Sequence, residues 1–255
     1  SIEADTEERE AFAINQLHDF NLNREWLEAL LNGQELPAEM LCAQGRWLPG
    51  VTGELAYGEY REQLMAFCDN IRMLAVGDKI TPTLLDIKIG RFRLTGRLAQ
   101  GFARGNLLYR YANLKGSDFV PAWLYHLASN NQTANSTHLL SADCLLTFDQ
   151  AFCPENALIE WLELYSEGKQ RPDAFFTEAA FAYLLQTHNN AIGNGRTPPY
   201  QAALNALRKV LDAPYENEIS QLFGSGTTIE ILLPETHSRL WDKLLLPAWE
   251  HAHGG

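Results

Sequence analysis

The spacing of apolar residues changes from a helical to a strand-like period between positions 53 and 95. Over residues 53–74 they recur about every 3.6 residues, which predicts one long amphipathic helix. Over residues 85–95 apolar and polar residues alternate on both sides of Gly90, which predicts a hairpin with one buried and one solvated face. The switch requires a fold that packs helices against a sheet.

The rest of the chain extends this order in both directions. Further helices are predicted at about 6–20, 23–31, 37–42, 117–129, 155–165, 175–187, 200–211 and 240–249, and further short strands near 107–112, 139–140 and 144–148. Helices, a small mixed sheet and helices again indicate an α/β (α+β) fold rather than a doubly wound sheet. We expect residues 1–45 to form a helical connecting segment and residues 46–255 to form the main domain.

Basic residues gather in one part of an acidic chain. The 20 basic and 32 acidic residues give a net charge of −12, which argues against tight, non-specific DNA binding. Residues 86–116 carry +6, with Asp86 as their one acid, and leave −18 on the remainder. The basic residues are Lys88, Arg91, Arg93, Arg97, Arg104, Arg110 and Lys115. On the predicted hairpin, Lys88, Arg91, Arg93 and Arg97 fall in the polar phase, so we expect one exposed basic face. That face is either a solvated surface or a set of DNA contacts.

Several classes of protein are disfavoured. No apolar run is long enough to predict a membrane-spanning helix, and the start of the chain is acidic rather than signal-like. The four cysteines form no C-x-x-C pair, which indicates reduced thiols and no zinc site. Phosphate-binding and nucleophile-elbow motifs are missing, so we expect no cofactor. The segment His251-Ala252-His253 is expected to be a frayed tail.

The later helices carry large apolar side chains that could face another protein. They are Phe175, Phe176, Leu240, Trp241 and Trp249. Large apolar patches on a folded surface mark interaction sites, so these residues are candidates for a partner interface.

A succession of short segments resembles the C-terminal region of the RecC family, the gamma subunits of bacterial exodeoxyribonuclease V. The segments are Gly53-Glu54-Leu55-Ala56-Tyr57, Phe92-Arg93-Leu94-Thr95-Gly96-Arg97-Leu98, Leu107-Leu108-Tyr109-Arg110-Tyr111, Ala122-Trp123-Leu124-Tyr125-His126-Leu127-Ala128, Leu232-Leu233-Pro234-Glu235-Thr236 and Leu244-Leu245-Leu246-Pro247. Their order and spacing carry the resemblance over most of the chain, least well at residues 193–226.

The resemblance implies a fold related to the PD-(D/E)xK nucleases, within a three-subunit helicase–nuclease. The partners it implies are the beta subunit, a helicase–nuclease, and the alpha subunit, a helicase. It implies a cytoplasmic role in double-strand break repair and recombination, in which the domain helps to separate and guide DNA strands and docks the alpha subunit.

The resemblance also points to the positions where an active relative holds its metal. Ala99 stands where a metal-binding Asp is expected, and residues 108–113 contain Arg110 but no acid. Asp86-Ile87-Lys88 spells D-x-K one strand too early, and Glu54 alone cannot hold Mg²⁺. We therefore expect a domain without catalytic or metal-binding residues. Two alternatives stay open: a divergent metal-dependent nuclease, and a module that binds only proteins.

Overall fold

The structure is a computed structural model that describes residues 16–75, 81–102, 105–150, 154–170, 175–195, 197–212 and 228–254. The chain divides into two compact units, Ser1–Leu74 and Ala75–Gly255. The division falls at the end of the long helix. The expected division after residue 45 therefore lies inside the first unit.

The first unit is built around one tryptophan. It contains α1 (Gln16–Leu31), α2 (Ala38–Ala43) and α3 (Gly50–Leu74). Trp26 of α1 has no exposed surface, and its ring stacks on Tyr57 of α3 at 4.9 Å and meets Trp47 edge-on at 5.7 Å. The Tyr57 hydroxyl donates to the carbonyl oxygen of Leu36, 2.7 Å away. Because α3 encloses Trp26, it belongs with the helices that precede it.

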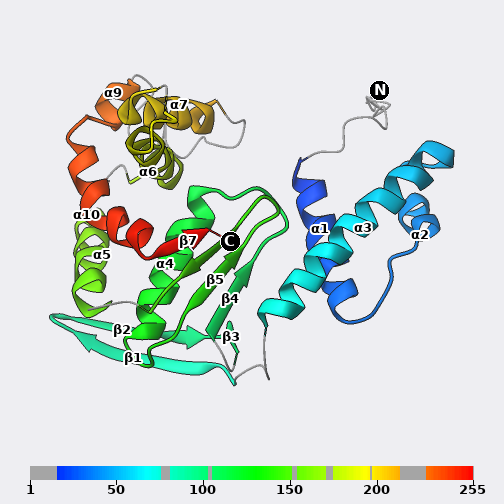
Figure 1. Ribbon diagram of the computed structural model, residues 1–255, viewed down its shortest axis with the longest axis horizontal. Coiled ribbons are helices and arrows are strands. Elements are labelled where there is room, and N and C mark those ends of the chain that lie inside the picture. Colours follow the sequence, from blue (N-terminus) through cyan, green and yellow to red (C-terminus); the bar gives the residue numbers. More distant parts are fainter. Residues whose placement is uncertain are drawn as a thin grey trace, which may run out of the picture. The chain divides into compact units, whose positions relative to one another are not determined.

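The second unit holds two separate sheets (Figure 1). The first is the predicted hairpin, in which β1 (Thr83–Ile89) and β2 (Phe92–Leu98) pair antiparallel. The second is a five-stranded sheet in the order β3-β4-β5-β6-β7. Its strands are β3 (Gly101–Phe102), β4 (Gly105–Tyr109), β5 (Thr137–Leu140), β6 (Leu145–Phe148) and β7 (Ala252–Gly254). Among the strand pairs that the structure describes in this sheet, β4–β5 alone is parallel, since α4 (Gly116–Asn130) carries the chain between these two strands.

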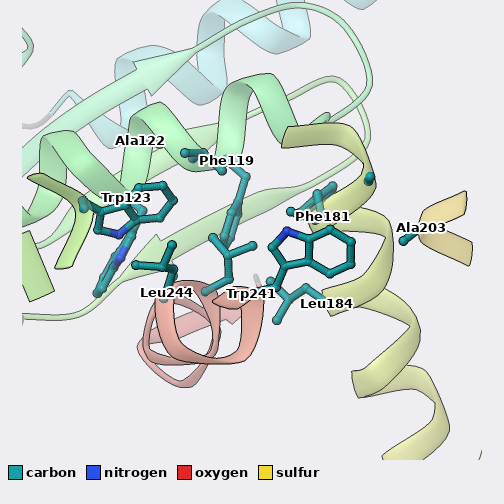
Figure 2. Packing of buried hydrophobic residues seen from close by; sticks show 14 of the residues in the cluster. Phe119, Ala122, Trp123, Phe181, Leu184, Ala203, Trp241 and Leu244 are labelled. Carbon is teal, nitrogen blue, oxygen red and sulfur yellow. The ribbon is translucent and has the colours of Figure 1, made fainter. Parts of the chain in front are cut away.

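Helices from the end of the chain complete the second unit. They are α5 (Pro154–Gly168), α6 (Thr177–Ala191), α7 (Pro199–Leu211), α9 (Ile229–Leu232) and α10 (His237–Glu250). Phe119 and Trp123 of α4 are fully buried against Phe148 of β6. In Figure 2 their rings lie close to the side chains of α10 and α6 that complete the core. The expected α+β class, with a small mixed sheet flanked by helices, is confirmed.

The start of α4 is in close contact with the start of α6. Gly116 begins α4 so close to α6 that an added Cβ would lie 2.2 Å from the carbonyl oxygen of Thr177. The approach lets Glu178 accept hydrogen bonds from the N–H groups of Gly116 and Ser117, both at 3.0 Å. A carboxylate at this point satisfies two otherwise unpaired donors and complements the positive end of the helix dipole.

The segment expected to be a frayed tail is part of the sheet. Ala252 and His253 pair with β6 in β7, and His253 Nε2 lies 2.8 Å from a carboxylate oxygen of Asp149. The expectation was wrong because an edge of the sheet is available to pair with the backbone there.

Candidate functional site

The hairpin places three of the predicted basic residues on one face. Lys88 lies directly opposite Arg93 in the register, and Arg97 lies opposite Leu84. Since alternate residues of a strand point the same way, all three share a face with Asp86 and Thr95. All three side chains belong to exposed residues. Lys88 and Arg97 are four register positions apart, roughly 13 Å at the rise of a strand.

One ion pair neutralises the middle of this face. Arg93 donates two hydrogen bonds to the carboxylate of Asp86, both at 2.7 Å, across the two strands. The hydrogen bond from Arg93 lowers the pKa of Asp86, so the carboxylate stays charged and paired. Within the described residues, Lys88 and Arg97 have no such partner. The strand face therefore presents two available cations rather than three.

The other predicted cations lie elsewhere. Arg91 sits in the two-residue turn at Gly90, with its guanidinium 4.9 Å from the centroid of the Phe92 ring, so it extends the tip rather than the strand face. Arg110 forms an ion pair with Asp118, and Lys115 precedes the first turn of α4. Arg104 lies outside the described residues. The predicted basic segment is thus divided among three elements.

The two positions at which the family resemblance expects metal-binding acids lie next to β4 and at its end. The N–H of Leu107 donates to the carbonyl oxygen of Gln100 at 3.0 Å, which places Ala99 beside β4. Just after β4, the guanidinium of Arg110 donates a hydrogen bond to the carboxylate of Asp118. Among the described residues there is no group of three His, Cys, Asp or Glu side chains that could hold a metal ion. A methyl group and a guanidinium do not fit Mg²⁺, which prefers oxygen ligands.

The five apolar partner candidates do not form the exposed patch that was expected. Trp241 has no exposed surface, and the expectation is wrong for it because Tyr183 covers its ring at 5.2 Å. Phe176, Leu240 and Trp249 are half-buried against the same core. Phe175 meets Trp161 edge-on at 5.3 Å and lines a groove that the sequence did not reveal.

The groove has a volume of about 880 Å³ and is lined almost entirely by apolar side chains. Its walls come from the apolar face of the hairpin, from α4 and from α5. The residues that line it are Leu85, Leu94, Pro121, Leu124, Tyr125, Ala128, Leu158, Trp161, Leu162, Leu164, Tyr165, Gly168, Lys169 and Phe175. The sequence holds one signal from which the groove could have been predicted: the 155–165 segment is apolar over more of its helix surface than a single buried face requires.

Comparison with protein families decides the identity of the fold. The model of the RecC C-terminal domain matches residues 1–188 of the 255-residue chain. The chain belongs to the RecC C-terminal domain family. A comparison with curated proteins found no match.

Family membership sets the biological context of the RecC domain. RecC is a subunit of exodeoxyribonuclease V, the RecBCD complex, and this chain is a domain of such a complex in DNA repair. The match covers β1–β6 and ends within α6, so the hairpin and the groove walls of α4 and α5 lie inside it, whereas α7, α9, α10 and β7 lie beyond it. Among the described residues no helix is long and apolar enough to cross a membrane.

Proposed function

We propose that this RecC domain is a non-catalytic part of its complex that contacts DNA through the charged face of the β1–β2 hairpin. The observation that supports the proposal is the contrast between the hairpin and the nuclease-like positions. Lys88 and Arg97 are exposed and lack an acidic partner within the described residues, whereas Ala99 replaces the carboxylate that chemistry would need. Such a domain can hold phosphates but has no means of cleaving them.

The proposed role is to separate and guide DNA strands while the beta and alpha subunits supply the helicase and nuclease activities. A two-stranded ribbon with cations on one face can lie along a phosphate backbone. Its positive charge is local, because the rest of the chain is acidic and repels DNA. The same domain is proposed to dock the alpha subunit, and the complex to act in the cytoplasm, as the family resemblance implies.

We expect the double variant Lys88→Glu/Arg97→Glu, in the assembled complex, to bind forked DNA more weakly. Each lost phosphate contact reduces the steepness of the plot of log binding constant against log salt by about 0.7 to 0.9, so two contacts reduce it by about 1.4 to 1.8. Binding is measured by fluorescence anisotropy at several salt concentrations, and the unwinding rate at two of them.

A matched control is the variant Arg208→Glu/Lys209→Glu. These two residues are exposed on α7 and give the same change in net charge. If both variants leave the salt dependence unchanged, the hairpin face is only a solvated surface. With the beta subunit's nuclease inactivated, Mg²⁺-dependent cleavage that Asp86→Ala or Glu54→Ala removes would instead favour the alternative of a divergent nuclease.

A further inference from the structure

The groove between the hairpin, α4 and α5 has the length and the regular walls of a helix-binding site. On α4, Pro121, Leu124, Tyr125 and Ala128 line it, and these positions follow the i, i+3, i+4, i+7 spacing of one helix face. On α5, lining residues extend from Leu158 to Gly168, which spans roughly 15 Å at the rise of a helix. The groove is therefore about three helical turns long.

The chemistry of the groove decides what conformation an occupant can adopt. Its lining offers few polar atoms, and most of the residues on α4 and α5 that line it present apolar side chains. An extended peptide would bring unpaired N–H and C=O groups into an apolar site, which is unfavourable for each amide that is left without a partner. A helix pairs its own backbone and presents only side chains. A small ligand would also lack the convergent polar groups that orient such molecules.

The one charged residue in the groove lining indicates which charge an occupant carries beside it. Lys169 is the one charged residue among the described residues that line it. Its ammonium lies 4.9 Å from the centroid of the Tyr165 ring and has no carboxylate partner in the described part of the chain. Tyr165 is 63 % exposed and Lys169 is also exposed, so both side chains are available to an occupant of the groove. An acidic residue on the occupant would complement Lys169.

We infer that the groove binds an amphipathic helix of a partner subunit, with an apolar stripe of about three turns and an acidic residue that contacts Lys169. The inference rests on the proposed function only in taking the domain to be docked to other subunits. It names a surface distinct from the DNA-binding face. Leu94 lines the groove, whereas Lys88 and Arg97 lie on the opposite face of the hairpin.

The test is site-specific cross-linking in the assembled complex. The photoreactive residue p-benzoylphenylalanine is placed at position 165, where the native Tyr165 is already exposed and aromatic. After irradiation, mass spectrometry identifies the cross-linked segment. We expect a single helical segment of a partner subunit, with an acidic residue within about one turn of the cross-link. The same probe at position 192 is the control, since Ile192 is 55 % exposed and lies outside the groove.

Reversing the charge of Lys169 provides the second part of the test. We expect Lys169→Glu to lower the cross-linking yield from position 165 at least five-fold, and Lys209→Glu, an equal change in net charge on α7, to leave it unchanged. Cross-links to DNA, to the same subunit, or to the segments found from position 192 would overturn the inference, as would an unaltered yield in Lys169→Glu. The cross-linking yield does not depend on DNA affinity. The groove inference can therefore be contradicted while the hairpin proposal stands, and the hairpin proposal can be contradicted while the groove inference stands.

Discussion

At the scale of single residues, His126 shows how the core controls the charge of a side chain. It is fully buried on α4, its Nδ1 lies 2.9 Å from the Thr137 hydroxyl, and Trp123 stacks on its ring at 5.4 Å. Burial lowers the pKa of His126 to about 4. The unfolded chain has a His pKa near 6.5, so it binds a proton between these values while the folded chain does not. Stability is therefore lost as the pH falls from about 6.5 to about 4.

We expect His126→Gln to remove that part of the pH dependence, which amounts to at most about 3 kcal/mol because each pKa unit corresponds to about 1.4 kcal/mol. The measurement is the free energy of unfolding in urea at pH 7, 6, 5 and 4.5 for both proteins. His188→Gln, on the surface of α6, should keep the dependence of the native protein. An equally steep loss of stability in His126→Gln would show that other groups cause it.

At the scale of elements, the joint between α4 and α6 depends on the lack of a side chain at Gly116. A methyl group there would lie 2.2 Å from the Thr177 carbonyl oxygen. It would push α6 away from the N–H groups of Gly116 and Ser117, which donate hydrogen bonds to Glu178. We expect Gly116→Ala to destabilise the second unit by about 1–3 kcal/mol, the usual effect of overpacking. The free energy of unfolding by urea is the measurement.

Gly168→Ala is the matched control for this joint, because it lies in α5 and an added Cβ meets nothing within 4 Å. Its stability should be unchanged or slightly raised, since Ala has the better helix propensity. Equal effects of the two substitutions would mean that the joint has no special packing requirement.

At the scale of the whole molecule, the described residues form two hydrophobic cores with no residue in common. Leu22, Trp26 and Leu64 are buried in the first unit, whereas the cluster around Phe119 and Trp241 belongs entirely to the second. We expect Trp26→Ala to destabilise the first unit by about 3–5 kcal/mol, the usual cost of removing a buried Trp. Hydrogen exchange with mass spectrometry should then show lost protection in residues 16–75 and native protection in residues 105–150.

The reciprocal variant Trp123→Ala should reverse this pattern, with protection lost in residues 105–150 and retained in residues 16–75. Loss of protection throughout the chain in either variant would contradict independent cores and would indicate that the two units fold as one.

Local periodicity in the sequence predicted several of the helices and strands that the structure contains. The alternation around Gly90 predicted the hairpin and its polar face, and the 3.6-residue spacing predicted α3, because both patterns depend on residues only a few positions apart. The succession of family-like segments predicted the RecC family, and the match of the family model to residues 1–188 confirms it.

Tertiary structure decided the features that depend on contacts between distant segments. The pairing of Arg93 with Asp86 follows from the register of two strands, and the burial of Trp241 follows from the way α10 packs against α6. The burial of Asn106 among Ser129, Asn135 and Thr137 likewise needs three separated segments. The groove combines walls from the hairpin, α4 and α5. The sequence by itself determined which faces are apolar or charged, but only packing determined which faces are covered, because burial depends on neighbours that lie far apart in the chain.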